Sequence, residues 1–428
     1  MLLQFTVGNF KSIADPQEFS LVAGKATTGK KRRSFPTGNT FASHALKTTA
    51  ILGANGAGKS SFLAALDFFV EFVENSAKNS SDGDEIDVTP FKLDRSFQSK
   101  PSTFEAVFVH EEALYQYGFA VDADRVLEEW LFSRPNEANT RMRSLFHRVY
   151  NSAGEYSWEI NDSYIKGERE VWRKSTRENA LFLSTAVQLN SEYLRSPYQW
   201  IAEYLRVLPS PDRISPGFTA RLWNDGEMRE SILRFIKSAD LKIEDIGVEE
   251  REFKLPKDVE LFMSEAGIKR MRDGARNAKT LEIHTFHKAT DGSLIRFDID
   301  EESSGTQVLF ALAGPWLDVL IKGYTLVVDE LHNSLHPLAL RHLIEMFYDP
   351  EINKSGAQLV FTTHDTTVLS GGLLQKDQVW LLEKNRNGAS HLYPLSDFDI
   401  RDSESFARGY LNGIFRGLPH PTEFEFGE

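Results

Sequence analysis

Apolar and polar residues alternate along several segments of the first third of the chain, which is the pattern of half-buried β-strands. We predict strands at residues 4–7, with a partner at 19–22, and at 103–109, 115–121 and 126–132. The segments 103–109 and 115–121 are separated by a short polar turn, so they predict an antiparallel hairpin that the next segment extends.

From about residue 165 to 275 the apolar residues recur at spacings of three and four, which predicts amphipathic helices. Three segments show this spacing most clearly: 177–189, 199–207 and 229–238. Alternation returns at 281–287 and 294–299, where we predict strands. No heptad pattern lasts long enough to predict a coiled coil.

A glycine-rich segment at residues 53–60 fits G-x-x-x-x-G-K-[ST], the pattern of the phosphate-binding P-loop. The apolar residues 48–52 predict a buried strand before it, and residues 61–66 open a helix that we expect to reach about Asn75. Backbone N–H groups in such a turn point at phosphate, and the helix dipole adds positive potential. We therefore predict a nucleotide site here.

Each P-loop side chain has an expected role. Lys59 would reach the β- and γ-phosphates, and Ser60 would hold Mg²⁺. The residues that we expect to bind the nucleotide here are Asn55, Gly56, Ala57, Gly58, Lys59, Ser60 and Ser61.

A second apolar segment, residues 325–328, ends in two acidic residues, Asp329 and Glu330. Open α/β sheets bind ligands at the carboxyl ends of their strands, so these side chains are candidate site residues. Asp329 would hold Mg²⁺, directly or through water, and Glu330 would orient or deprotonate the attacking water. The alternative is a strand followed by an acidic helix cap.

Two further features follow the same logic. The turn Ser304-Gly305 precedes an apolar helix at 308–313 and is a candidate anion site, with simple capping by Ser303 or Ser304 as the alternative. A buried-type strand at 358–363 is followed by His364, which would bond a γ-phosphate oxygen. A hydrogen-bonded structural histidine is the alternative there.

The order of these motifs resembles that of the ATP-binding-cassette (ABC) ATPases. Residues 304–307 look like their signature motif, with Thr306 where the usual pattern has a second glycine. Residues 333–336 stand in the place of the D-loop, and His364 in that of the switch histidine. We find no convincing glutamine loop, because the candidate Gln98 lies in a polar linker.

The opening residues 7–13, VGNFKSI, look like the N-terminus of the SMC/RecF/OLD branch. That resemblance implies that Lys11 and Ser12 approach the nucleotide. Residues 297–307 and 377–384 further resemble the stand-alone ATPases of bacterial phage-defence and abortive-infection operons, of the RloA, AriA and PtuA types.

The resemblance implies ATP and Mg²⁺ as cofactors and two chains packed head-to-tail. Ser304 and Gly305 of one chain would complete the ATP site of the other, where Lys59, Glu330 and His364 carry catalysis. It also implies a higher homo-oligomer as an option, a separate toxin or nuclease effector, and a phage protein as trigger.

These features predict an α/β fold: an ABC-type P-loop ATPase domain, with a mixed sheet flanked by helices, split by a mainly helical insertion. We expect residues 1–150 and 281–428 to form the ATPase domain and residues 151–280 to form the insertion. A RecF-like DNA-repair ATPase and an ATP-using scaffold with slow turnover remain alternatives. An OLD-like nuclease is a further alternative, although the chain after His364 is too short for a TOPRIM domain.

Composition and charge restrict the binding partners and the cellular location that we expect. The net charge of −13 opposes indiscriminate binding to nucleic-acid phosphates, and the basic run at 30–33 is either a solvated loop or a contact with nucleic acid or a partner. Cysteine is absent, which excludes disulfides and thiolate metal sites. The start lacks signal-peptide features, and the apolar run at 308–321 looks too short to span a bilayer, so we expect a cytoplasmic protein. The acidic residues Asp397 and Asp399 are more typical of a solvated turn than of a metal site.

Overall fold

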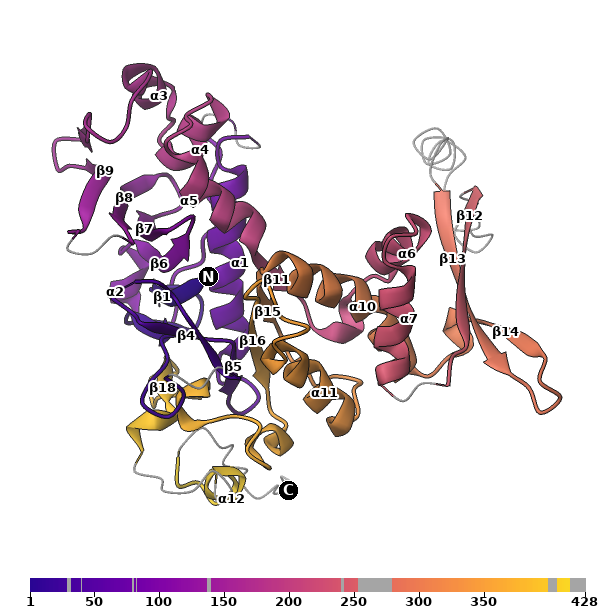
Figure 1. Cartoon of the computed structure of the whole chain (residues 1–428). Helices are drawn as coiled ribbons and strands as arrows, with labels where there is room; N and C mark the ends of the chain where they lie inside the picture. Colours follow the sequence, from indigo (N-terminus) through magenta and orange to yellow (C-terminus); the bar gives the residue numbers. More distant parts are fainter. Residues whose placement is uncertain are drawn as a thin grey trace, which may run out of the picture. The chain divides into compact units, whose positions relative to one another are not determined.

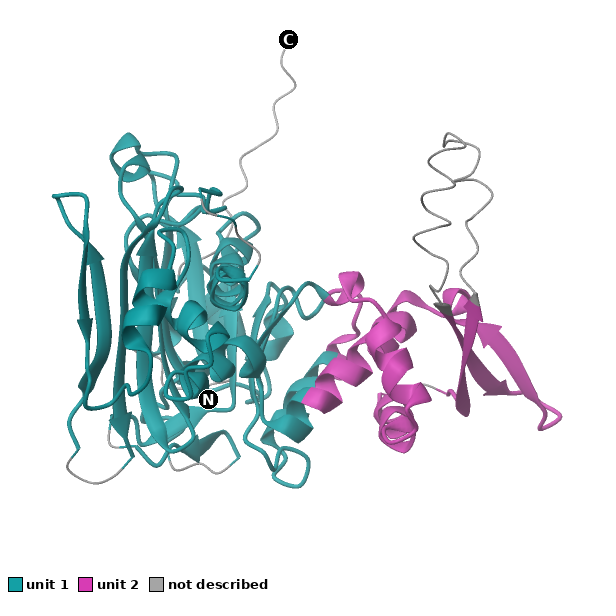
Figure 2. Cartoon of the chain, turned by 90° about the horizontal axis from the view of Figure 1, so that it is seen from above, with its two compact units in different colours: residues 1–210, 319–332, 340–428 teal, residues 211–318, 333–339 magenta. Residues whose placement is uncertain are grey.

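The computed structural model describes residues 1–28, 32–39, 41–78, 81, 83–136, 140–239, 242–252, 279–398 and 406–415. The chain forms two compact units, which Figure 2 shows in teal and magenta. Unit 1 comprises residues 1–210, 319–332 and 340–428, and unit 2 comprises residues 211–318 and 333–339.

The first sheet of unit 1 is antiparallel and has the strand order β10-β9-β8-β7-β6-β1-β2. Its strands are β1 (Leu2–Gly8), β2 (Gln17–Ser20), β6 (Ser102–His110), β7 (Ala113–Val121), β8 (Val126–Pro135), β9 (Arg143–Tyr150) and β10 (Tyr156–Ile160). The pairs Gln4↔Ser20 in β1–β2 and Val109↔Leu114 in β6–β7 confirm the predicted strand pair and hairpin.

The second sheet of unit 1 has the order β11-β15-β16-β5-β17-β18. Its strands are β5 (Thr48–Leu52), β11 (Leu205–Leu208), β15 (Thr325–Val328), β16 (Gln358–Thr363), β17 (Val379–Lys384) and β18 (Ser390–Pro394). Neighbouring strands are parallel except β18, which is antiparallel to β17. Every residue of β5, β15 and β16 is buried, as parallel strands covered on both faces require.

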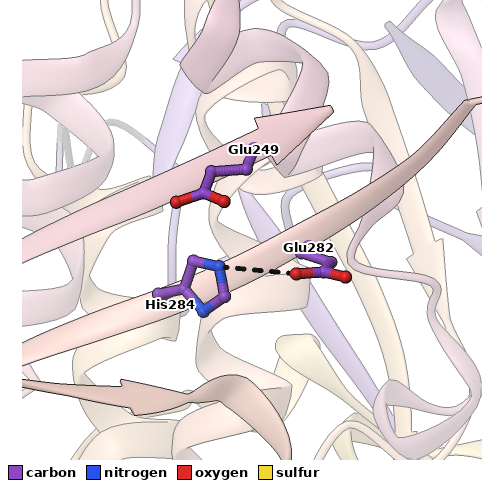
Figure 3. A group of neighbouring side chains, drawn as sticks. All are labelled: Glu249, Glu282 and His284. Atoms are coloured by element: carbon purple, nitrogen blue, oxygen red, sulfur yellow. Dashed lines mark ion pairs between the residues drawn. The ribbon is translucent and has the colours of Figure 1, made fainter. Parts of the chain in front are cut away.

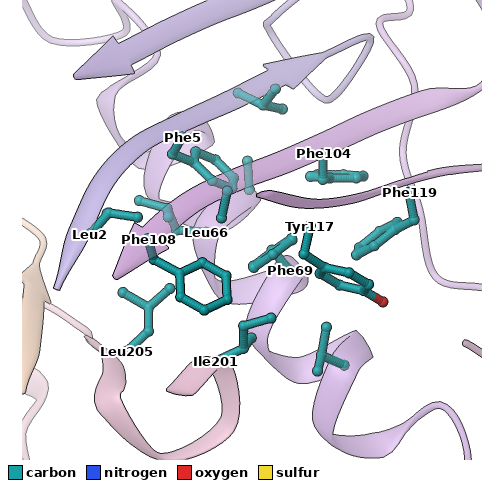
Figure 4. Packing of buried hydrophobic residues seen from close by; sticks show 14 of the residues in the cluster. Leu2, Phe5, Leu66, Phe69, Phe104, Phe108, Tyr117, Phe119, Ile201 and Leu205 are labelled. Carbon is teal, nitrogen blue, oxygen red and sulfur yellow. The ribbon is translucent and has the colours of Figure 1, made fainter. Parts of the chain in front are cut away.

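Helix α1 (Lys59–Asn75) lies between these two sheets (Figure 1). Phe62 and Phe69 on α1 contact Phe5 of β1 with ring-centroid separations of 5.9 and 5.6 Å. Figure 4 shows Phe69 beside Phe119 of β7, where the two rings stack at 5.5 Å. The same apolar cluster includes Val360 of the parallel sheet. The core of unit 1 is therefore built around the helix that follows the P-loop, and this helix ends where we predicted.

Short elements complete unit 1. They are β3 (Ser34–Pro36), β4 (His44–Leu46), α2 (Arg95–Gln98), α3 (Arg169–Ser175), α4 (Phe182–Gln188), α5 (Arg195–Gln199), a π-helix (Trp200–Tyr204), α12 (Phe406–Leu411) and 3₁₀ turns at Thr366–Leu369, Lys376–Gln378 and Leu395–Asp397. Helix α11 (Pro337–Tyr348) begins in unit 2 and continues in unit 1.

The helix predicted at 199–207 is wrong in its second half. Leu205–Leu208 forms strand β11, which pairs in parallel with β15. A short apolar run does not distinguish a strand from a buried helix, so the neighbouring sheet decided its conformation. The helix predicted at 177–189 is shorter than expected, since α4 covers only Phe182–Gln188.

Unit 2 contains helices and a small sheet. Its elements are a 3₁₀ turn (Pro211–Arg213), α6 (Gly217–Asn224), α7 (Arg229–Ser238), β12 (Asp245–Glu252), β13 (Lys279–Lys288), β14 (Leu294–Asp298), a 3₁₀ turn (Ile299–Glu301) and α10 (Ser304–Lys322), whose last residues belong to unit 1. Strand β13 pairs with both β12 and β14. Helix α7 and strands β13 and β14 confirm predictions, whereas β12 lies in a region where we expected helices.

Helix α10 is long and apolar enough to cross a membrane by length and composition, and 61% of its most apolar window is buried. The run that we expected to be too short is therefore part of a 19-residue helix. The core helices of water-soluble proteins can have the same length and composition, and α10 is mostly buried. The hydroxyl of Thr219 on α6 donates to the carbonyl of Ala311 at 3.0 Å and so fixes α6 to α10.

A buried ion pair links the antiparallel sheet to α4. The side chains of Glu129 and Arg148 are fully buried, with Arg148 Nε 3.1 Å from Glu129 Oε2. Glu129 also accepts hydrogen bonds from Tyr117 Oη and from the backbone N–H groups of Phe182 and Leu183. Burial raises the pKa of the Glu129 carboxyl, and the Arg148 guanidinium opposes that rise.

We predict that Arg148→Leu lowers the free energy of unfolding by about 3–5 kcal/mol, because it leaves a buried carboxylate without its counter-ion. Urea unfolding followed by circular dichroism measures the change. The matched control is Arg234→Leu, which removes an exposed ion pair with Glu230 and should cost at most about 1 kcal/mol. Equal effects of the two substitutions would contradict the prediction.

Candidate functional site

The carboxyl ends of three neighbouring parallel strands in unit 1 carry the predicted site residues. Strand β16 lies between β15 and β5, with the pairs Val328↔Phe361 and Thr363↔Leu52 at its end. The P-loop follows β5, Asp329 follows β15 and His364 follows β16. Because parallel strands end at one edge of a sheet, three segments distant in sequence converge there.

The P-loop backbone requires glycine at two positions. Gly58 has φ 110°, and a Cβ there would lie 2.1 Å from Ser390 Oγ. A Cβ at Gly53 would lie 2.4 Å from the carbonyl oxygen of Leu382. Asn55 is exposed at the tip of the loop. The loop is thus packed on β17 and β18 at its base and open at its tip, where phosphate would bind.

The remaining P-loop residues follow from the same geometry. Gly56 is exposed, Ala57 is buried and Ser61 is partly exposed on the first turn of α1. Lys59 is 5% exposed, and its Nζ donates to the carbonyl oxygens of Gly53 at 2.8 Å and Ala54 at 3.2 Å. Burial lowers the pKa of the Lys59 ammonium, and the carboxylates of Glu330 and Asp329 oppose that change.

Ser60, Asp329 and Thr362 form a connected group of oxygens. Ser60 Oγ donates to Asp329 Oδ2 at 2.8 Å, and Thr362 Oγ1 donates to Asp329 Oδ1 at 2.5 Å. A hydroxyl and a carboxylate are the oxygen ligands that Mg²⁺ takes beside a nucleotide. The two residues that we predicted as metal ligands therefore lie together, and their donor set fits the ion.

Glu330 has an unusual backbone conformation. Its φ is 44°, in the left-handed region that non-glycine residues rarely adopt. Its backbone N–H donates to Thr362 Oγ1 at 2.8 Å, and the next N–H, that of Leu331, donates to the carbonyl of Thr362 at 3.1 Å. Strained backbone of this kind persists where surrounding bonds hold it and is concentrated at functional sites.

The histidine predicted at the end of β16 has a histidine partner. His364 Nε2 lies 2.9 Å from His332 Nε2, and the ring centroids are 3.9 Å apart. His364 is exposed, and His332 is partly buried. His332 lies two residues after Glu330, so both histidines belong to the same end of the sheet.

The N-terminal motif divides into structural and site-facing residues. The side chain of Asn9 bonds the backbone of Phe91, Phe97 and Lys100 and so holds that loop. Ser12 Oγ accepts from Ser390 Oγ at 2.8 Å, close to where a Cβ at Gly58 would lie.

Lys11 has a different neighbour. Burial raises the pKa of the Asp67 carboxyl on α1, and the charge of Lys11 opposes that rise. Ser12 thus lies against the P-loop and Lys11 lies near Asp67, and an approach of either residue to the nucleotide stays a prediction.

The predicted signature turn lies in unit 2. Ser304 is exposed and opens α10. Thr306 N donates to Ser303 Oγ at 3.2 Å, so Ser303 is the capping residue. A Cβ at Gly305 would lie 3.1 Å from the carbonyl oxygen of Ser334, in the predicted D-loop. The turn and the D-loop segment are therefore adjacent within unit 2.

Sequence reasoning missed three residues of this region: Thr362, His332 and Ser390. Thr362 was hidden in a strand that reads as uniformly buried, and only the parallel register places its hydroxyl beside Asp329. Ser390 was hidden because β18 is distant in sequence from the P-loop. A histidine two residues after the acidic pair was visible in the sequence and was a usable signal for His332.

A cluster in unit 2 has the composition of a metal site. Glu249, Glu282 and His284 lie together on β12 and β13 (Figure 3). Arg296 Nη1 lies 3.0 Å from Glu249 Oε1, and Arg251 Nη1 lies 2.9 Å from Glu282 Oε1. Guanidinium groups already neutralise both carboxylates, so the cluster is an ion-pair network.

Of the acidic residues predicted near the C-terminus, Asp399 lies outside the described residues, as do Lys30 and Lys31 of the basic run.

A P-loop after β5, a carboxylate pair after β15 and the parallel strand β16 between them define a P-loop nucleotide-binding fold. Residues 48–370 match the protein family described as "AAA domain, putative AbiEii toxin, Type IV TA system". The chain belongs to this family. The comparison with curated proteins found no match. The predicted α/β class is confirmed.

Two solved structures are similar over most of their length. They are the recombination mediator protein RecF-ATPrS and RecF-ATP in the RecFOR pathway, each 12% identical, with TM-scores of 0.31 and 0.32. The alignments cover 92% of this chain and 98% and 97% of the RecF chains.

We predict that Thr362→Val reduces ATP turnover or Mg²⁺ affinity about 10- to 100-fold, because it removes the hydroxyl that orients Asp329 and the Glu330 backbone. Steady-state phosphate release over a range of Mg²⁺ concentrations measures both. Thr49→Val on β5 is the matched control, since Thr49 Oγ1 is buried with no hydrogen-bond partner. A wild-type rate for Thr362→Val would contradict the assigned role.

Proposed function

We propose that this protein is an ABC-type ATPase that binds and hydrolyses ATP and controls a separate toxin or nuclease effector in a bacterial anti-phage system. The observation that carries the ATPase part is the bonded group of Ser60, Asp329 and Thr362 beside the strained Glu330. It supports a site in which a metal-bound triphosphate meets a positioned water molecule.

The residues present assign a role to each part of the reaction. P-loop N–H groups and Lys59 would hold the β- and γ-phosphates, and Ser60 with Asp329 would hold Mg²⁺. Mg²⁺, when bound, neutralises charge on the phosphate oxygens. Glu330 would accept a proton from a water molecule while the water oxygen attacks the γ-phosphorus in line. The bond between the γ-phosphorus and the oxygen that bridges it to the β-phosphate then breaks. His364 would contact the γ-phosphate.

We further propose that the working site needs two chains packed head-to-tail. Ser304 is exposed and Gly305 follows it at the N-terminus of a long helix, where N–H groups and the helix dipole favour an anion. In this arrangement Ser304 and Gly305 of one chain contact the γ-phosphate held by the P-loop of its partner. Each half-site is then incomplete alone.

The defence role draws support from the family description, which names a toxin of a type IV toxin–antitoxin system. An effector would dock on surfaces that the ATP site does not need. The helical insertion at about 165–275 is one such surface, since it does not include Ser304 or Gly305. The segment around α12 is another, because Leu411 and Ile414 are 60% and 64% exposed. The proposal includes an ATPase domain formed by residues 1–150 and 281–428, with residues 151–280 as its insertion. A phage protein would trigger the effector, and the protein would act in the cytoplasm.

Co-expression with the neighbouring gene tests the regulatory role. The tagged chain is purified with and without ATP, and the complex is analysed by size and mass. A stable second subunit whose binding depends on ATP is the expected result. A lone ATP-dependent dimer that carries DNA would overturn the effector proposal in favour of a DNA-repair ATPase.

We predict that Glu330→Gln retains ATP binding and loses turnover by about 10²- to 10⁴-fold, the usual contribution of a general base. Isothermal titration and phosphate release separate the two quantities. Glu351→Gln, at a mostly exposed position, is the control. If Glu330→Gln also left phage protection intact in cells, ATP would act as a structural ligand and hydrolysis would not be the working step.

The head-to-tail arrangement predicts complementation between inactive chains. Lys59→Ala spoils the P-loop half-site and Ser304→Arg spoils the signature half-site, so each variant alone should be inactive. An equal mixture should recover about a quarter of wild-type turnover, since half the dimers are mixed and each has one intact site. No recovery, with dimers still forming, would contradict a site shared between chains.

A further inference from the structure

Two histidine nitrogens face each other at the end of β16, and only one proton fits between them. His332 Nε2 and His364 Nε2 are 2.9 Å apart. A neutral imidazole has one N–H donor and one lone-pair acceptor. At this distance one of the two nitrogens donates and the other accepts, so the contact determines on which ring nitrogen each histidine carries its proton.

The second nitrogen of His332 decides the direction of that bond. His332 Nδ1 is buried and has no hydrogen-bond partner. A buried N–H group without an acceptor is rarer in proteins than a buried acceptor without a donor. The proton of His332 therefore lies on Nε2 and points at His364, and His364 accepts it on Nε2.

This arrangement requires His364 Nε2 to keep its lone pair. Burial lowers the pKa of His332, and His364 lowers it further, while the carboxylates of Glu330 and Asp365 raise it and Lys59 opposes them. A proton added at His364 Nε2 would place two N–H groups against each other, which breaks the hydrogen bond.

We propose that His332 is a positioning residue that holds His364 with its Nε2 unprotonated until ATP binds. A phosphate oxygen only accepts hydrogen bonds, so His364 has no Nε2–H to offer while the pair is intact. With Nε2 as the nitrogen that meets the γ-phosphate, the nucleotide competes with His332 for this atom, and the pair has to open. This last step rests on the proposed ATPase function, whereas the proton arrangement does not.

Nitrogen-15 NMR of histidine-labelled, nucleotide-free protein tests the proton arrangement directly, because ring-nitrogen shifts report which atom is protonated. His364→Gln and His332→Gln spectra assign the signals. We expect His364 Nε2 to be unprotonated and His332 Nε2 to be protonated. A protonated His364 Nε2 overturns the inference, whether or not the protein hydrolyses ATP.

Nucleotide affinity tests the competition. His332→Phe keeps the ring and removes the donor, so it should bind a fluorescent ATP analogue about fivefold more tightly, the effect of one lost competing hydrogen bond. His332→Gln retains an N–H donor and should bind with wild-type affinity. The matched control is His391→Phe on β18, where His391 Nε2 pairs with the side chain of Asn385.

The outcomes separate the two proposals. Unchanged or weaker binding by His332→Phe, with His332→Gln unchanged, overturns the competition. Failure of the wild-type chain to bind any ATP would instead overturn the proposed function, and the NMR result would still decide the proton arrangement.

Discussion

The burial of helix α1 between two sheets is the constraint on which the rest of unit 1 depends. Phe62 and Phe69 pack against the antiparallel sheet, and the same apolar cluster continues to Val327 and Val360 in the parallel sheet. A helix covered on both sides cannot shift without opening one of the two interfaces, since protein interiors are close-packed. The P-loop begins that helix, so its position relative to both sheets is determined by the core.

Buried amide side chains connect the first strand and helix α11 to this core. Gln358 on β16 bonds both backbone groups of Leu2 in the first strand and accepts from Thr325 on β15. Gln378 donates to Thr48 on β5 and to Tyr348 on α11. The buried amide groups of both glutamines are hydrogen-bonded to the protein in place of water. Another strand pairing would leave these groups without partners, so the bonds make the observed pairing specific. The edge of the sheet that carries the candidate site thus rests on a polar network as well as on apolar packing.

The residues at the candidate-site edge of the sheet come from segments that are far apart in sequence. Asp329, Thr362 and the P-loop come from three strands whose parallel order is β15, β16, β5. The Thr362 hydroxyl donates its proton to the Asp329 carboxylate and accepts a hydrogen bond from the backbone N–H of Glu330. One hydroxyl therefore orients both acidic residues. A single threonine therefore couples the carboxylate beside Ser60 to the strained backbone of the residue after it.

The sequence by itself determined the local elements that have strong periodicity or strict backbone demands. The P-loop, the extent of α1, the β6–β7 hairpin and the acidic end of β15 were all predictable, because glycine spacing and apolar periodicity are local properties. The turn at Ser304 was also found from its residues.

Only the tertiary structure decided the rest. Leu205–Leu208 became a strand because an open edge of β15 was available, and no local pattern records that. The contacts of Thr362 and Ser390, and the pairing of His332 with His364, arise from segments that are far apart in sequence. The physical reason is that sheet register and side-chain contact are set by long-range packing, which a one-dimensional pattern does not contain.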